Sequence, residues 1–462
     1  MVTYTCETCL KEFSQKGHMD SHKNRKSPCK KNTTLETIIE QKVKEALERS
    51  KIEQQQSIVS ITTMDYSTLG ALELMGLCKQ RGVPLSDFNG LKAPQLRTLL
   101  VERDRTHYKV ISLFSGMGGM DVGFAEQVAV HKNSVPDTFV STPHTTSNFV
   151  NLQRLPFETV FQNDILPAAE KVAKLNGWNH NYHMKDIREM LKENFAFPAA
   201  HVITGGFPCQ DFSHAGKRLG FDSSRGTLYQ SYVDLVSRVK PFMFVAENVE
   251  GLLTMPGEPI KKIIADFSAV GYEVKYQLIK CEEFGIPQSR HRVIIMGLRL
   301  DKRPADLPAD WNIISENRRR VALRDYFAHL QEPADSTDPA QQVYSKAARL
   351  EKGQGQSEVN LDGAGPTMRA EHHGNIEFRR VKPSKNGEAT TLEERRLTVR
   401  EAALIQTFPP DCKLTETRLT TMAYKPIGNA VPPLLGYLVA RKVREVLTRS
   451  QVPSAQQQGG GQ

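Results

Sequence analysis

The sequence predicts an α/β protein with an open, mostly parallel, doubly wound sheet. From Lys109 onward, short runs rich in β-branched residues alternate with amphipathic stretches. Because strands and helices alternate, the strands are expected to run parallel and to hold ligands at their carboxyl ends. The strand-like runs occupy residues 109–114, 158–164, 201–206, 242–249, 272–280 and 291–298, and helical stretches that each close on a capping glycine occupy residues 165–177 and 259–271.

Length and composition are those of a multi-domain globular protein. The chain has 462 residues, of which 39% are hydrophobic and 24% are charged. No apolar run approaches the roughly 20 residues that cross a bilayer, and the N-terminus lacks the form of a secretion signal. We therefore expect a soluble, intracellular protein. A net charge of +9 favours a polyanionic partner.

Changes in composition divide the chain into parts. The head is rich in cysteine and lysine, and the tail is a low-complexity glutamine and glycine segment that we expect to be disordered. The expected parts are a head at 1–31, a helical linker at 32–60, a short helical module at 61–104, an α/β domain at 105–300 and 395–447, an irregular region at 301–394 and a tail at 448–462.

The loop after the first strand is rich in glycine and reads FSGMGGMDVGF. Gly116, Gly118 and Gly119 would let the backbone turn sharply and approach a cofactor, although such a turn fits any nucleotide. Asp164 ends the second strand, and Asp186 follows a third short segment. Carboxylates at these positions suit ribose hydroxyls, but each is equally suited to cap a helix.

A cysteine and a glutamate follow two further strands. Cys209 lies in the polar loop TGGFPCQDFSHAGKRLGF, and Glu247 lies in the strand end AENVEGL. A buried cysteine is often a small hydrophobic residue, and an exposed glutamate is often a helix cap. A thiol and a carboxylate at neighbouring strand ends also form a nucleophile with an acid.

Six motifs in order resemble those of the cytosine-5 DNA methyltransferases. The resemblance covers roughly residues 109–447, and the set is far more specific than any one tripeptide. The motifs are FSGMGG, PCQ at 208–210, ENV at 247–249, QSRHR at 288–292, LTVREAALIQTFP at 397–409 and GNAVPP at 428–433.

The resemblance implies methyl transfer to carbon 5 of cytosine. In this scheme Cys209 attacks carbon 6 of the base, which makes carbon 5 electron-rich, and Glu247 acts as general acid at N3. Arg290 and Arg292 contact the base, brace Glu247 or favour the thiolate, and Arg292 is the better candidate for the base contact. The cytosine must be flipped out of the duplex.

The resemblance also implies S-adenosylmethionine as the cofactor. Asp164 is expected at the ribose, and Asp186 with Ile187 at the adenine. Ser112 stands where many family members have aspartate, and residues 131–156 form a long insertion before the second strand. The methionine part is assigned to Phe114, Ser115, Gly116, Met117, Gly118 and Gly119, and the remaining walls to Thr227, Leu228, Asn429 and Val431.

The irregular region at 301–394 is expected to recognise the target bases. Its stretch GAGPTMRAEHHGNIEFRR is basic and suits contacts with phosphates or base edges, although an ordinary solvated insertion would look similar. His372 and His373 lack a partner cysteine at ligand spacing and do not predict a metal site. We expect a monomer on duplex DNA, with no membrane contact. The sequence leaves open whether a cognate restriction endonuclease exists.

The head is similar to a zinc finger. Cys6, Cys9, His22 and Cys29 have the spacing of four metal ligands, and a domain this small needs a metal to fold. Residues 67–100 resemble a SAP-type DNA-binding module, with two helices around RGVPLSDFNG, but a plain helical hairpin fits nearly as well. Such a combination resembles proteins of large DNA viruses and favours the nucleus or a site of DNA replication.

Two other functions remain open at this point. A tRNA cytosine-5 methyltransferase has the same fold and chemistry, but the Cys-Phe-Thr tripeptide typical of that branch is absent. A DNA-binding regulator without activity is expected to have lost the nucleophile or the glutamate, and both are present here. Duplex DNA methylation is therefore the favoured prediction.

Overall fold

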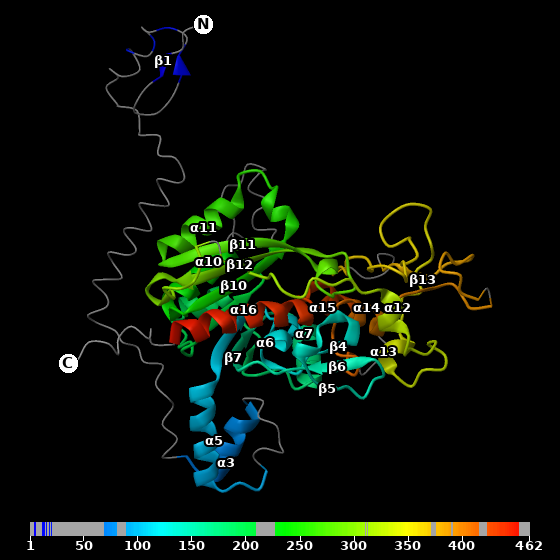
Figure 1. The fold of residues 1–462 in the computed structure, drawn as a ribbon, viewed down its shortest axis with the longest axis horizontal. Coiled ribbons are helices and arrows are strands. Elements are labelled where there is room, and N and C mark those ends of the chain that lie inside the picture. Colours follow the sequence, from blue (N-terminus) through cyan, green and yellow to red (C-terminus); the bar gives the residue numbers. More distant parts are fainter. Residues whose placement is uncertain are drawn as a thin grey trace.

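The structure is a computed structural model (Figure 1). Cys209 lies outside the described residues, and so do the four predicted zinc ligands, the linker at 32–60 and both His372 and His373. The structure describes residues 69–80, 89–208, 227–309, 311, 313–370, 376–389, 391–414 and 423–451, together with 4–5, 12–13, 15, 18 and 20.

A seven-stranded sheet forms the centre of the molecule, in the order β11-β12-β10-β9-β3-β7-β8. Neighbouring strands are parallel except for β12, which is antiparallel to both β10 and β11. The six predicted strands and the mostly parallel sheet are thus confirmed. The strands are β3 (Tyr108–Leu113), β7 (Phe157–Asn163), β8 (Tyr182–His183), β9 (Val202–Gly205), β10 (Met243–Val249), β11 (Tyr272–Lys280) and β12 (His291–Arg299).

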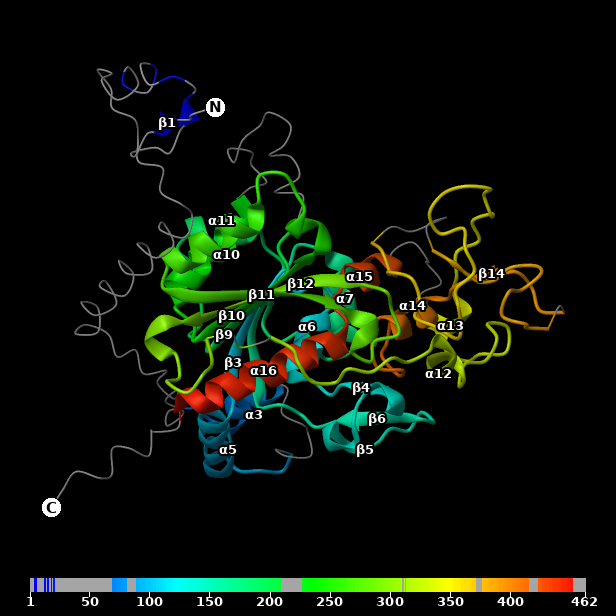
Figure 2. The same cartoon turned by 45° about the horizontal axis from the view of Figure 1, so that its top comes forward.

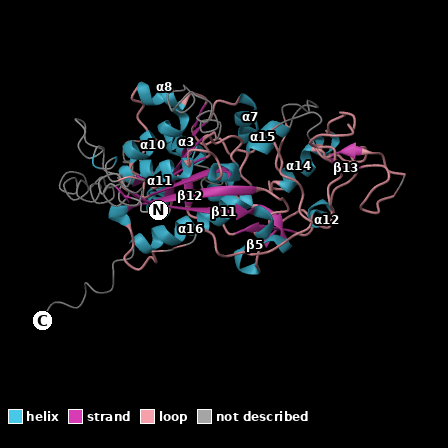
Figure 3. Cartoon of the chain, turned by 90° about the horizontal axis from the view of Figure 1, so that it is seen from above, coloured by secondary structure: helices cyan, strands magenta, loops and turns pink. Residues whose placement is uncertain are grey.

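Helices cover both faces of this sheet because its strands are apolar on both sides. On one face Val110 and Val202 pack against α6 (Gly119–Ala125), α7 (Pro167–Leu175) and α16 (Pro433–Gln451). On the other, Ile111 and Ile203 pack against α8 (Ile187–Lys192), α10 (Thr227–Val239) and α11 (Pro259–Ala269). The view from above shows the strands between α16 and the α8, α10 and α11 side (Figure 3). The doubly wound architecture is confirmed.

The insertion before the second strand folds into a small antiparallel sheet of β4 (Ala129–His131), β6 (Phe149–Leu152) and β5 (Val140–Pro143). It lies beside the helical part of the irregular region (Figure 2). The Ser134 and Tyr326 hydroxyls are 2.7 Å apart, and the Phe149 ring meets Tyr326 edge-on. The insertion therefore supports the region expected to recognise DNA.

The irregular region projects from one end of the molecule (Figure 1). Its basic stretch FRR was expected to face DNA, but Arg380 is 1% exposed and pairs with Glu332 and Glu388, each at 3.0 Å. Arg379 pairs with the same Glu388, at 2.6 Å. These two arginines are therefore internal supports. Elements here and at the return to the sheet are α12 (Leu323–Phe327), α13 (Pro339–Gln342), β13 (Phe378–Arg380), β14 (Arg395–Arg396), α14 (Val399–Ile405) and α15 (Tyr424–Asn429).

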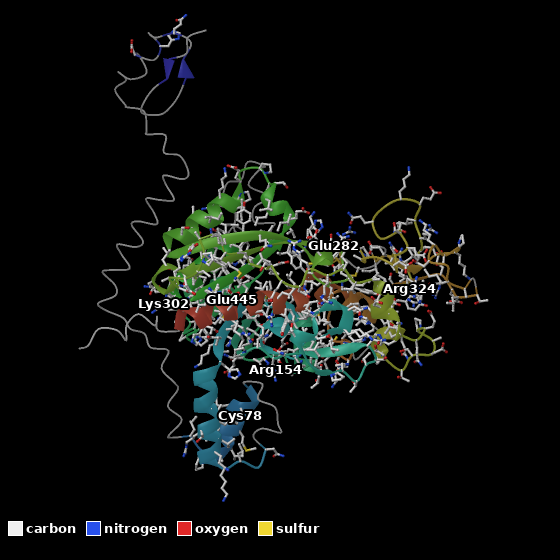
Figure 4. All side chains as sticks on the ribbon, in the orientation of Figure 1. Cys78, Arg154, Glu282, Lys302, Arg324 and Glu445 are labelled. Atoms are coloured by element: carbon white, nitrogen blue, oxygen red, sulfur yellow. The ribbon has the colours of Figure 1, made fainter. Side chains whose placement is uncertain are left out.

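Two helices, α3 (Ala71–Gln80) and α5 (Ala93–Thr106), occupy the predicted helical module. Leu74, Cys78, Leu96 and Leu100 form its small core, and Figure 4 labels Cys78 within this helix pair. The two expected helices are confirmed, and both a SAP-type module and a plain hairpin remain compatible with them.

The ends of the chain add two observations. In the head, β1 (Tyr4–Thr5) pairs antiparallel with β2 (Glu12–Phe13). At the other end α16 continues to Gln451, so residues 448–451, which were expected in the disordered tail, are helical. Within the described ranges, no helix has the length and apolar character needed to span a membrane.

Candidate active site

Among the described residues, the predicted cofactor residues of β3 and β7 lie where the chain reverses its direction of travel across the sheet. From β3 the chain passes to β7 on one side and later to β9 on the other. The loops that follow neighbouring strands at such a reversal diverge and leave a crevice between them. The glycine turn follows β3, and the loop that contains Cys209 follows β9.

The glycine turn is tightly folded. Phe114, Gly116 and Gly118 all have positive φ values, of 52°, 55° and 91°. The Gly118 N–H donates to the Ser115 carbonyl at 2.9 Å, and the Ser115 N–H donates to the Asn163 carbonyl of β7 at 3.0 Å. A Cβ at Gly116 would meet no atom within 4 Å, so the outer side of the turn is open to a ligand.

The C-terminal motif GNAVPP packs against the start of α6. A Cβ at Gly119 would collide with the Val431 carbonyl oxygen, so glycine is required for this close approach. Asn429, at the end of α15, is exposed, and Val431 is half-buried. The structure thus brings together two predicted cofactor segments that are 300 residues apart in the sequence, whereas Met117 is fully buried and faces the core.

Asp164 ties the glycine turn to the second strand. Its Oδ2 accepts from the Gly116 N–H at 2.8 Å, and its Oδ1 accepts from the Ile165 and Leu166 N–H groups at 2.7 and 2.9 Å. Burial raises the pKa of Asp164, and these three bonds oppose the rise. A carboxylate has about four lone-pair sites, so one remains for a ligand hydroxyl. The side chain of Ile165, next to it, is 62% exposed.

Asp186 is the N-cap of α8. Its Oδ1 accepts from the Arg188 N–H at 2.8 Å, and its Oδ2 pairs with Arg188 Nη2 at 2.5 Å. The hydrogen bond from Arg188 lowers the pKa of Asp186. The capping alternative is thus confirmed for this residue. Ile187, the first residue of α8, is buried. Thr227 is the first residue of α10, and the half-buried Leu228 that follows it packs against the same core as Ile187.

The Glu247 carboxylate lies at the entrance to the cysteine loop. A Cβ at Gly206 would lie 3.1 Å from Glu247 Oε2, and Arg292 Nε lies 2.7 Å from Oε1. The neighbouring Asn248 donates from Nδ2 to the Phe207 carbonyl at 3.1 Å. The chain is therefore held beside Glu247 up to the second residue before Cys209.

Arg290 contacts main-chain carbonyls. Its Nη1 donates to Met368 at 2.9 Å, and its Nη2 donates to Ala430 at 3.1 Å and Gly428 at 3.3 Å. Burial lowers the pKa of this guanidinium to about 9, which still leaves it charged at neutral pH. Arg290 thus joins the arginine motif to the recognition region and to GNAVPP.

Two glutamines extend this clamp, and sequence analysis missed both. The Gln288 Nε2 donates to Gln406 Oε1 at 2.7 Å, and the Gln406 Nε2 donates to the Ala430 carbonyl at 3.0 Å. Both glutamines are fully buried. The available signal was a glutamine within each of two motifs, QSRHR and LTVREAALIQTFP. A buried amide side chain is expected to satisfy buried polar groups by hydrogen bonding. Asn248, within the ENV motif, likewise was not assigned its contact with the Phe207 carbonyl.

Comparisons with known proteins identify the family of this chain. The sequence model of the C-5 cytosine-specific DNA methylases matches residues 108–445. The Type II methyltransferase M.BspRI of Lysinibacillus sphaericus is 33% identical over 384 residues, 77% of this chain and 87% of its own. M.BsuRI of Bacillus subtilis is 32% identical over 371 residues, 72% of this chain and 78% of its own.

Solved structures share the fold. The S. pombe Dnmt2 methyltransferase superposes with a TM-score of 0.51 at 18% identity, over 73% of this chain and 99% of its own. A putative DNA modification methyltransferase from an E. coli prophage gives 0.50 at 20% identity, over 74% and 99%. The chain therefore belongs to the C-5 cytosine-specific DNA methylases, and it is a DNA (cytosine-5)-methyltransferase that uses S-adenosylmethionine.

Proposed function

We propose that Cys209 is the covalent nucleophile of this enzyme and that Glu247, oriented by Arg292, is its general acid. The observation that carries the proposal is the junction between β9 and β10. Asn248 holds the Phe207 carbonyl, and Glu247 lies against Gly206, so the chain enters the cysteine loop directly beside the carboxylate. A nucleophile and an acid that act on one small ring must approach it together.

The proposed chemistry begins with the Cys209 thiolate. It bonds to carbon 6 of the flipped cytosine while Glu247 gives a proton or a strong hydrogen bond to N3, and this makes carbon 5 electron-rich. After carbon 5 is methylated, it loses its proton to a base, the carbon 6–sulfur bond breaks and the thiolate is regenerated. Any proton that N3 received returns to Glu247, so the acid is regenerated as well. General acid assistance of this kind contributes roughly 10²–10⁴-fold to the rate.

The ends of β3 and β7 carry residues that suit S-adenosylmethionine, which supplies the methyl group when bound. The open outer side of Gly116 leaves room for the methionine part, and Asp164 retains one lone-pair site for a ribose hydroxyl. The exposed Ile165 offers an apolar surface for the adenine ring, and Asp186 with Ile187 is proposed to contact the same ring through the start of α8. Phe114, Ser115 and Gly118 shape the turn, and Asn429 with Val431 closes it.

Arg290 is proposed as a positioning residue. Its guanidinium is occupied by three carbonyls from two distant segments, which favours Arg292 for contact with the base or with Glu247. The recognition region, 301–394, is proposed to read duplex DNA with its exposed side chains. The buried Arg380 and the largely covered Arg379, both paired with Glu388, are excluded from that set.

The head is proposed to be a zinc finger with Cys6, Cys9, His22 and Cys29 as ligands. The β1–β2 pairing supports it, because a short hairpin around the first two cysteines is typical of such fingers. Metal analysis of the full chain is expected to find one zinc ion per molecule, lost in a Cys6→Ser, Cys9→Ser double variant. Equal zinc in both proteins would refute this assignment.

The nucleophile is tested by trapping. DNA in which 5-fluorocytosine replaces every cytosine of one strand is incubated with the full-length enzyme and cofactor. Because fluorine cannot leave carbon 5 as the proton does, wild type is expected to form an adduct that survives denaturation. Cys209→Ser is expected to form none while it still binds the cofactor.

Cys281→Ser is the matched control for this experiment. Cys281 is fully buried, and burial raises its pKa to about 12, so its thiol stays protonated. The control variant is expected to form the adduct. An adduct with Cys209→Ser, or no adduct with wild type and control, would overturn the proposed mechanism.

A further inference from the structure

A row of polar side chains crosses the buried sheet beneath the glycine turn. Ser112 of β3 is paired with Gln162 of β7 on one side and with Thr204 of β9 on the other. All three are at most 2% exposed, and they lie on the face that packs against α6. Buried polar groups cost free energy unless they are hydrogen-bonded, so this row needs a reason beyond packing.

Ser112 is the middle member of a hydrogen-bond chain that ends on Asp121 of α6. Its Oγ donates to Asp121 Oδ2 at 3.0 Å, and the Ser115 Oγ donates toward the Ser112 Oγ at 2.9 Å and the Ser112 carbonyl at 3.0 Å. An ionised carboxylate only accepts. Asp121 therefore fixes the direction of the chain, because it takes the Ser112 proton and leaves the Ser112 oxygen free to accept from Ser115.

This chain holds the centre of the turn assigned to the cofactor. Ser115 stands between Phe114 and Gly116, both of which have left-handed backbone conformations. A left-handed non-glycine residue costs roughly 1–3 kcal/mol and persists only where its surroundings impose it. Ser115 also accepts from the Asn163 N–H, at 3.3 Å, so its hydroxyl is fixed from two strands.

The carboxylate itself is costly to the fold. Asp121 is 3% exposed, and burial raises its pKa to about 6. Its Oδ1 forms no hydrogen bond of normal geometry, although the Gln162 amide lies near enough to oppose the rise in pKa. His180, paired with Glu126 at 2.5 Å, opposes it more weakly, and Tyr182 also faces this charge. Nothing in the packing requires an acid here.

We propose that Asp121 is a positioning residue that fixes the cofactor turn through Ser112 and Ser115 and so sets the affinity for S-adenosylmethionine without touching it. The proposal rests on the assignment of this turn to the cofactor. It also accounts for Ser112 in the position where many family members have aspartate, because the carboxylate comes here from the following helix.

The test is calorimetric binding of S-adenosylmethionine to the full-length protein. Ser115→Ala removes the first link and leaves Ser112 bonded to Asp121, and Asp121→Asn removes the charged acceptor. Each is expected to raise the Kd about tenfold, the size of one charge-assisted hydrogen bond. The double variant is expected to be no weaker than either single variant, because both break one chain.

Steady-state kinetics separates positioning from general damage. The KM for S-adenosylmethionine is expected to rise with the Kd, while kcat at saturating cofactor and the KM for DNA change less than twofold. Exchanging the partners, Ser112→Asp with Asp121→Ser, keeps a carboxylate against a hydroxyl and is expected to recover most of the affinity. A purely structural role would instead lower stability and leave the cofactor KM unchanged.

Thr204→Val is the matched control. Thr204 lies in the same buried row, its hydroxyl has no hydrogen-bond partner, and it is outside the chain. Its Kd is expected to equal that of wild type. Less than twofold change in both Asp121→Asn and Ser115→Ala, or an equal change in Thr204→Val, would overturn the proposal. Failure of wild type to bind the cofactor at all would refute the assignment of the turn instead.

Discussion

Arg292 and Glu247 form a shielded ion pair in which Nε lies 2.7 Å from Oε1 and each side chain is 12% exposed. Water screens such a pair much less than a surface pair, so the arginine holds the carboxylate in one direction. Glu250 makes a useful contrast, since it is 50% exposed and pairs with His291 just beyond the same strand. The two glutamates differ in environment although they are three residues apart.

Replacing Glu247 tests its role in proton donation. Glu247→Gln is expected to lower the single-turnover methylation rate roughly 10²–10⁴-fold because the amide cannot give a proton to N3. Cofactor affinity is expected to stay unchanged. Glu250→Gln serves as the control and is expected to keep the wild-type rate. Similar losses in the two variants would mean that Glu247 has no special role.

Replacing Arg290 tests the clamp between distant motifs. Arg290→Met removes the donor to the carbonyls of Met368 and Gly428, whereas the Ala430 carbonyl still accepts from Gln406. The free energy of unfolding is expected to fall by roughly 2–5 kcal/mol. Urea denaturation measures this change. Arg292→Lys is measured in parallel and is expected to reduce activity more than stability. An Arg290→Met protein of normal stability and low activity would make Arg290 a catalytic residue after all.

Arg395 provides a test of the internal support of the recognition region. It pairs with Glu401 through two hydrogen bonds, of 2.9 and 3.0 Å, and both side chains are at most 4% exposed. Arg395→Met leaves the Glu401 charge buried, so we expect a loss of about 3–5 kcal/mol of stability. The exposed ion pair of Arg324 with Asp362 is the control, and Arg324→Met is expected to change stability far less.

Arg395→Met also shows whether Arg395 supports the fold of the recognition region or contacts DNA. Arg395 is buried, so at temperatures where the variant is folded the salt dependence of DNA binding is expected to match that of wild type. A shallower dependence of the logarithm of the binding constant on salt in Arg395→Met would show that this arginine neutralises a phosphate. Fluorescence anisotropy at several salt concentrations measures the slope.

The main sheet was predictable because its strands are buried runs of β-branched residues bounded by turn signals. The two-residue strand β8 is too short to give such a pattern. In the insertion, β4 has only three residues and β5 and β6 are partly exposed, so their sequences resemble loops. The site residues were found as motifs at strand ends. Their partners, such as Gln406 for Gln288, come from segments more than 100 residues away that no local pattern connects.

Charge was the least reliable sequence signal. The arginines of the stretch that ends at Arg380 looked like phosphate contacts, but Arg379 and Arg380 pair with Glu332 and Glu388 inside the region. Similarly, Ser112 was recognised as a departure from the family, whereas its compensation by Asp121 depends on how α6 folds back over β3. Sequence shows that a charge is present, and only the fold shows what it faces.

The buried Asp121 carboxyl predicts a specific dependence of stability on pH. Its pKa is about 6 in the folded protein against 3.8 in the unfolded chain, because burial disfavours the charged form. The folded state therefore holds this proton more tightly. The resulting stabilisation is fully present below pH 3.8 and is lost as pH rises through about 6, a change on the order of 3 kcal/mol.

Asp121→Asn removes this titration and keeps a neutral side chain of the same shape. The variant is expected to exceed the wild-type unfolding free energy by about 1 kcal/mol near pH 4.5 and by about 3 kcal/mol at pH 7.5. Urea denaturation of both proteins across this range gives the difference, in which all other titrating groups cancel. A gap that is constant with pH would contradict a raised pKa for Asp121. Greater stability with weaker cofactor binding would mean that the acid is kept for function at a cost to the fold.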